Sequence, residues 1–168
     1  PKIVNLKNER VISMMTAYDY PSAKAVSEAE IDIILVGDSL AQVVLGHDDT
    51  LSVTIDEMLH HVKAVTNAKP TSLVVADMPY MSFHSTPKET LYNASRFIQE
   101  GKADAVKLEG GSKRRFVDRL IREEIEKGAE EFVYGGCPAN GYAQLSLTLQ
   151  AKVYDKKAIF FMAKRSLD

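Results

Sequence analysis

This sequence has few cysteines, little excess charge of either sign and no long hydrophobic run, and each of these scarcities excludes a class of protein. A single cysteine, Cys137, occurs among the 168 residues, which excludes an intramolecular disulfide framework and suits a reducing compartment. The 21 Lys and Arg residues nearly balance the 23 Asp and Glu residues, and the net charge is −2. Without a broad positive field, we expect neither a nucleic acid nor a membrane surface as a partner.

Long hydrophobic runs are missing as well. The longest, such as Ile33–Val36 and Leu73–Ala76, fall far short of the roughly 18 residues that a membrane-spanning helix needs. The first ten residues mix Lys, Asn, Glu and Arg and lack the apolar core of a secretory signal. With 45% hydrophobic and 26% charged residues, the composition is typical of one soluble globular domain, which we expect in the cytoplasm.

Strand-like and helix-like segments alternate along the chain. Short apolar runs predict strands at residues 11–17, 33–36, 73–76, 105–108 and 131–134. Stripes at helical spacing predict helices at residues 22–29, from 54 onward, from 86 to about 100 and from 112 to about 128. This order implies a parallel α/β sheet, either doubly wound or belonging to a (β/α)8 barrel, and a barrel normally needs about 250 residues.

Two of the helix starts carry specific capping signals. Thr54 and Glu57 have the spacing of a capping box, in which each side chain bonds the other residue's backbone N–H. Thr86 precedes Pro87, a residue favoured at the first helical position, and Gly101 is expected to end that helix.

An acidic residue follows each of three predicted strands. Asp38, Asp77 and Glu109 stand where strands 33–36, 73–76 and 105–108 end. If these strands are neighbours, the three carboxylates meet at one rim, where they repel one another unless a hard cation such as Mg²⁺ lies between them. Taken singly, Asp38 or Asp77 is as easily explained as a helix cap or a turn residue.

A lysine and four histidines are the other candidates for chemistry. Lys107 lies two residues before Glu109, on the same side of the strand, where its ammonium either pairs with an acid or contacts an anionic ligand. The neighbours His60 and His61 do not share a helix face, so we expect surface residues there rather than a metal pair. His47 and His84 fall in loops, where solvated side chains are commoner than proton carriers.

Four motifs together carry a resemblance to a known family. Met15–Asp19, Val36–Leu40, Val75–Pro79 and Lys107–Gly111 occur in the order of the ketopantoate hydroxymethyltransferase (3-methyl-2-oxobutanoate hydroxymethyltransferase) family, and the resemblance covers about residues 9–111. It implies a (β/α)8 TIM barrel of the phosphoenolpyruvate/pyruvate superfamily and, as in that family, a homo-oligomer, specifically a decamer. It also implies a step of pantothenate biosynthesis, in which 3-methyl-2-oxobutanoate takes a hydroxymethyl group from 5,10-methylenetetrahydrofolate to give 2-dehydropantoate.

The resemblance assigns roles to particular residues. It makes Asp38, Asp77 and Glu109 the ligands of Mg²⁺, and Asp38, Ser39, Asp77 and Lys107 the residues that hold the oxo acid. Mg²⁺ chelated by the carboxylate and keto oxygens would then stabilise the enolate formed when C3 loses its proton, and Lys107 would add positive charge beside it.

The second half of the chain departs from the family pattern. Gly136, within the stretch Tyr134–Pro138, stands where the family has a substrate-facing histidine, and residues from about 123 to 162 do not follow the pattern. The glutamate that serves the family as general base cannot be located. We therefore expect residues 1–168 to form a single α/β-barrel domain, altered or incomplete in its C-terminal half, that does not complete the reaction by itself.

Two other functions stay open from the sequence. One is a Mg²⁺-dependent lyase or mutase of the same superfamily that acts on 2-oxo acids. The other is a catalytically inactive binding or assembly subunit that keeps the fold. Binding of 3-methyl-2-oxobutanoate with product formation would distinguish the transferase from both.

Overall fold

The computed structural model describes residues 3, 6, 9–108, 131–135 and 157–161. The chain divides into two compact units, Pro1–Leu108 and Glu109–Asp168, and each is described by itself. The prediction that residues 1–168 form one domain stays a prediction. In the described ranges, no helix combines the length and the apolar character needed to cross a membrane.

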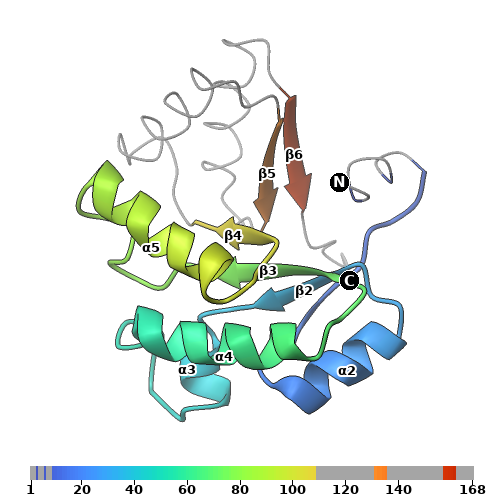
Figure 1. Ribbon diagram of the computed structural model, residues 1–168, viewed down its shortest axis with the longest axis horizontal. Helices are drawn as coiled ribbons and strands as arrows, with labels where there is room; N and C mark the ends of the chain where they lie inside the picture. Colours follow the sequence, from blue (N-terminus) through green and yellow to red (C-terminus); the bar gives the residue numbers. More distant parts are fainter. Residues whose placement is uncertain (1–2, 4–5, 7–8, 109–130, 136–156, 162–168) are drawn as a thin grey trace, which may run out of the picture. The chain divides into compact units, whose positions relative to one another are not determined.

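The first unit is a four-stranded parallel sheet flanked by helices, in the strand order β1-β2-β3-β4. The strands are β1 (Met14–Thr16), β2 (Ile33–Val36), β3 (Leu73–Asp77) and β4 (Ala105–Lys107). The helices are α2 (Tyr20–Glu28), α3 (Leu40–Val43), α4 (Ile55–Asn67) and α5 (Pro87–Gln99). The predicted alternation of strands and helices is confirmed, and Figure 1 shows α2, α3 and α4 on one side of β2 and β3.

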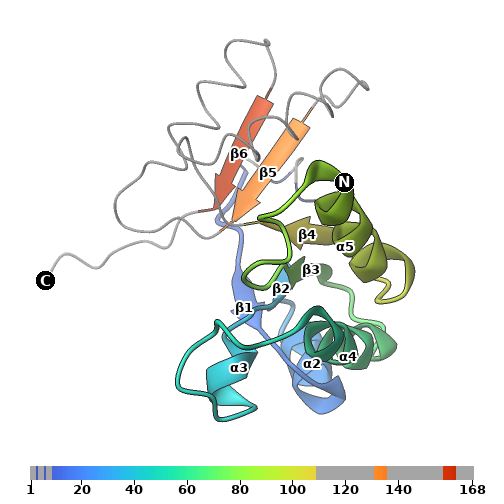
Figure 2. The ribbon, with the colours of Figure 1, turned by 90° about the vertical axis from the view of Figure 1, so that its left-hand side faces the viewer.

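The two faces of this sheet have different surroundings. Alternate side chains of the central strands pack against the helices in the hydrophobic core, namely Ile34, Val36, Val74 and Ala76. A fully buried Val or Ile side chain contributes roughly 1.5–3 kcal/mol to stability. Helices α2 and α4 lie side by side, below the strands in Figure 2. The strand register places Leu35, Val75, Asp77 and Lys107 on the opposite face.

Local hydrogen bonds determine where the helices begin. The predicted capping box is present, because Thr54 Oγ1 accepts from the Glu57 backbone N–H at 3.2 Å and Glu57 accepts from the Thr54 backbone N–H at 2.7 Å. Thr86 caps α5 as predicted. Helix α2 begins at Tyr20, earlier than the predicted residue 22, because Asp19 accepts from the Ser22 backbone N–H at 2.8 Å and caps the helix.

Gly101 follows the end of α5 for a packing reason. A Cβ at this position would lie 2.6 Å from the Phe97 carbonyl oxygen and 2.8 Å from Val62 Cγ1 of α4. The backbone turn with positive φ falls on the next residue, Lys102, with φ 59°. The glycine therefore marks the helix end, as predicted, but it is required by the close approach of α4.

The second unit contains a pair of parallel strands, β5 (Glu131–Gly135) and β6 (Lys157–Phe161). β5 confirms the strand predicted at residues 131–134. β6 was not predicted, because the hydrophobic pattern around it has no clear boundaries. The helix predicted from 112 to about 128, together with Glu109, Gly136 and Cys137, lies outside the described residues.

Candidate active site

Two buried charged residues meet at the carboxyl edge of the sheet. Asp77 is the last residue of β3, Lys107 is the last residue of β4, and the two are register partners on neighbouring strands. Lys107 Nζ lies 2.8 Å from each carboxylate oxygen of Asp77. The side chains are only 4% and 10% exposed, respectively. The parallel register thus produces a buried ion pair where α/β folds place their ligands.

The electrostatics of Asp77 show that its ionised form is costly in this pair. Burial is the main cause that raises the pKa of the Asp77 carboxyl to about 6, and the negative charge of Asp38 contributes to this rise. The charge and hydrogen bonds of Lys107 lower this pKa but do not offset the burial. Added positive charge at this edge would therefore stabilise the carboxylate.

Asp38 and Ser39 reach the same edge from the end of β2. The Asp38 backbone N–H donates to Asp77 Oδ2 at 3.4 Å, and both Asp38 and Ser39 are half-buried. Gly37 permits this approach, because a Cβ there would lie 3.0 Å from Ser39 Oγ and 3.9 Å from Asp77 Oδ2. Four of the five predicted site residues, Asp38, Ser39, Asp77 and Lys107, therefore come from adjacent strand ends of one sheet.

The third predicted metal ligand, Glu109, lies outside the described residues. Among the residues that the structure describes, no three His, Cys, Asp or Glu side chains are grouped closely enough to hold a metal ion. Asp38 and Asp77 offer carboxylate oxygens at this edge, and carboxylate oxygens are the ligands that Mg²⁺ prefers.

Sequence reasoning did not single out Tyr18, which the structure brings to this site. Its hydroxyl oxygen lies 2.8 Å from Ser39 Oγ. Tyr18 belongs to the motif Met15–Asp19 and directly follows the strand that contains β1, so the strand-end rule that selected the acids would also have found it. His61 was expected at the surface but is half-buried, and its Nδ1 lies 2.7 Å from the Tyr18 carbonyl oxygen.

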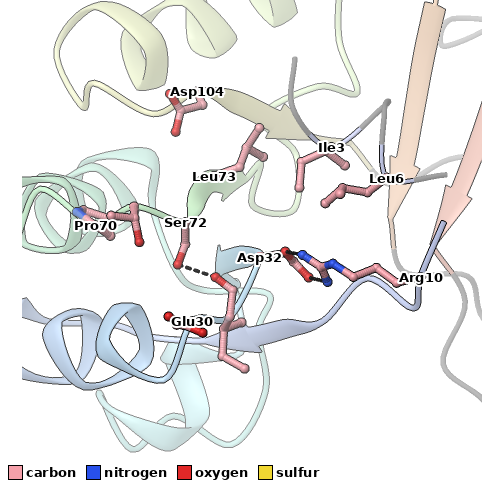
Figure 3. A pocket seen from close by; sticks show the side chains of 11 residues that line it. Ile3, Leu6, Arg10, Glu30, Asp32, Pro70, Ser72, Leu73 and Asp104 are labelled. Atoms are coloured by element: carbon pink, nitrogen blue, oxygen red, sulfur yellow. Dashed lines mark hydrogen bonds and ion pairs between the residues drawn. The ribbon is translucent and has the colours of Figure 1, made fainter.

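A pocket of about 680 Å³ lies at the opposite, amino end of the strands (Figure 3). Several of its polar side chains have protein partners: Arg10 Nη1 donates to Asp32 Oδ2 at 2.7 Å, Ser72 Oγ donates to the Ile31 carbonyl at 2.6 Å, and Asp104 accepts from the Val74 backbone N–H. In parallel α/β folds this end of the sheet serves stability. We therefore assign the candidate site to the carboxyl edge.

Comparison with known proteins yields related sequences and related folds. The chain matches the ketopantoate hydroxymethyltransferase family over residues 1–129. It is 52% identical over 128 residues to 3-methyl-2-oxobutanoate hydroxymethyltransferase of Syntrophobacter fumaroxidans, covering 76% of this chain and 44% of the relative. It is 46% identical over 140 residues to the enzyme of that name from Oleidesulfovibrio alaskensis, covering 83% of this chain and 45% of the relative.

Solved structures confirm the predicted fold class. A crystal structure of 2,3-dimethylmalate lyase, a member of the PEP mutase/isocitrate lyase superfamily, matches this chain with a TM-score of 0.62 and 16% sequence identity. The match covers 95% of this chain and 62% of the lyase chain. The chain spans less than half the length of the two curated relatives described above. Its match to the family nevertheless extends over more than three quarters of its own residues, so this chain belongs to the ketopantoate hydroxymethyltransferase family.

Proposed function

We propose that this protein takes part in hydroxymethyl transfer from 5,10-methylenetetrahydrofolate to 3-methyl-2-oxobutanoate, which gives 2-dehydropantoate in pantothenate biosynthesis. The observation that carries the proposal is the buried pair of Asp77 and Lys107 at the carboxyl edge, with Asp38 and Ser39 beside it. Membership of the family supports it, because the curated relatives bear the name of this activity.

Asp38 and Asp77, together with Glu109, are the residues that would hold Mg²⁺. The donor set fits, since carboxylate oxygens suit this hard cation and Asp77 is a buried carboxylate whose pKa is raised. When bound, the ion supplies Lewis-acid polarisation of a keto oxygen. The co-substrate 5,10-methylenetetrahydrofolate follows from the family, and no described residue is assigned to it.

Lys107 and Ser39 would bind and orient the oxo acid. The Lys107 ammonium is a fixed positive charge that is 10% exposed, and charge is stabilised more strongly in such a site than in water. Its position favours the build-up of negative charge on a neighbouring keto oxygen. Ser39 has a hydroxyl that suits one oxygen of the substrate carboxylate, and Gly37 leaves room for it.

The proton acceptor at C3 is not assigned to any residue of this chain. We propose that Asp38, Ser39, Asp77 and Lys107 supply the metal and oxo-acid part of the site. The proposal includes a cytoplasmic location and a homo-oligomer, which in the family is a decamer. Cell fractionation checks the location, and light scattering checks the oligomeric state.

Calorimetric titration of the full chain with 3-methyl-2-oxobutanoate, with and without Mg²⁺, tests the proposal. We expect binding that requires Mg²⁺ and that Asp77→Asn and Lys107→Met abolish. Lys63→Met is the matched control, because Lys63 is 46% exposed on α4 and its Nζ lies 3.5 Å from Glu100. The absence of Mg²⁺-dependent binding would refute the site.

A further inference from the structure

Tyr18 connects three elements of the first unit to the candidate site. Its hydroxyl lies 2.8 Å from Ser39 Oγ, at the start of α3. Its backbone N–H donates to Ser22 Oγ of α2 at 3.3 Å, and its carbonyl oxygen lies 2.7 Å from His61 Nδ1 of α4. Hydrogen bonds to the peptide units before and after Tyr18 therefore hold its backbone in place.

The contact with His61 also determines which ring nitrogen carries a proton. A carbonyl oxygen only accepts hydrogen bonds, so the Nδ1 atom of His61 must be the donor. The Tyr18 carbonyl is therefore anchored to α4 by a directional bond. With its backbone fixed, the tyrosine side chain has little freedom to move its hydroxyl away from Ser39.

Ser39 does not use its side chain to cap its own helix. It occupies the position before α3, but its hydroxyl makes no capping bond there. The 2.8 Å contact with Tyr18 is one in which either hydroxyl can be the donor. The direction of this bond therefore decides whether the Ser39 hydrogen remains available to a ligand.

An anionic ligand fixes that direction. A substrate carboxylate only accepts hydrogen bonds, so Ser39 must donate to it, and Tyr18 must then donate to Ser39 Oγ. A phenol O–H is a stronger hydrogen-bond donor than the aliphatic hydroxyl of serine, which favours tyrosine as the donor. Consecutive bonds of this kind polarise and strengthen one another.

We propose that Tyr18 is a positioning residue for the oxo acid, whose hydroxyl orients Ser39 so that Ser39 donates to the substrate carboxylate. This inference rests on the proposed function. Tyr18 itself need not touch the substrate, because it acts through Ser39, and His61 holds its backbone in position.

Tyr18→Phe tests the inference, because it removes only the hydroxyl. The dissociation constant of 3-methyl-2-oxobutanoate, measured calorimetrically on the full chain with Mg²⁺, is expected to rise about three- to tenfold, the loss of one hydrogen bond. The dissociation constant of Mg²⁺ measured alone is expected to stay unchanged. Tyr92→Phe is the matched control, because Tyr92 is 65% exposed on α5.

A double-mutant cycle separates positioning from a merely structural role. Ser39→Ala is expected to weaken oxo-acid binding, and Tyr18→Phe added to it is expected to cause no further loss. An equal loss in both backgrounds, unchanged binding by Tyr18→Phe, or weakened Mg²⁺ binding by Tyr18→Phe would each overturn the inference while the proposed function stands. Failure of the unaltered chain to bind the oxo acid at all would overturn both.

Discussion

Replacing Lys107 by methionine probes the buried ion pair most directly. The substitution keeps an unbranched apolar stem and removes the ammonium that lies 2.8 Å from both oxygens of Asp77. Asp77 would then be a carboxyl group, 4% exposed, without its cationic partner. Breaking a buried ion pair from one side typically costs about 3–5 kcal/mol.

The size of the loss is expected to depend on pH. The pKa of the Asp77 carboxyl is 3.8 in its ordinary state and about 6 in the folded protein, so the folded state binds this proton more tightly. Stability from this group is fully present below pH 3.8 and is lost as the pH rises through 6, by about 3 kcal/mol in total. Lys107 lowers the pKa of Asp77, so removing Lys107 raises that pKa. The loss of stability then continues to a higher pH than in the unaltered protein.

We expect Lys107→Met to lower the free energy of unfolding by about 3 kcal/mol at pH 8 and by less than about 1 kcal/mol at pH 5, where Asp77 is protonated with or without the lysine. Urea unfolding followed by circular dichroism, with EDTA present, measures both values. Lys63→Met is the control, and a change within about 0.5 kcal/mol is expected at either pH. The double variant Asp77→Asn/Lys107→Met is expected to regain most of the loss at pH 8. An equal loss at both pH values, or no recovery in the double variant, would refute this account of the pair.

Three further predictions concern packing, capping and the amino end of the sheet. Gly101→Ala is expected to destabilise the protein by about 1–3 kcal/mol in urea unfolding, because its Cβ would lie 2.6 Å from the Phe97 carbonyl oxygen; an unchanged midpoint would contradict the close approach. Thr54→Ala is expected to lower the free energy of unfolding by about 1 kcal/mol, because the cap of α4 is lost. Thr54→Ser is expected to keep most of the stability, because a serine hydroxyl also caps a helix. Hydrogen bonding from Arg10 lowers the pKa of Asp32 from 3.8, so its stabilisation is present above that pH and is lost as the pH falls. Asp32→Asn is therefore expected to cost about 1–2 kcal/mol at pH 7 and less at pH 3, and an equal cost at both pH values would count against the pairing.

Much of the local structure could be predicted from the sequence because it depends on near neighbours. The strand at 33–36 has the predicted bounds, since its run of apolar residues is covered on both faces. Thr54 and Thr86 cap the helices that their spacing predicts, because a capping bond joins residues three positions apart. The short helix α3 and the strand β6 were missed, because neither has a periodic pattern with clear ends.

The sequence by itself determined the alternation of strands and helices, the position of an acidic residue after each of three strands, and membership of the family. Only the tertiary structure decided which side chains meet. The register of β3 against β4 pairs Asp77 with Lys107, and the fold brings Tyr18 to Ser39 across 21 positions of the chain. Burial, which no spacing reveals, then raises the pKa of Asp77. These contacts depend on how parallel strands align and on how much water the packed helices and strands exclude, and both are properties of the folded chain rather than of any short segment of it.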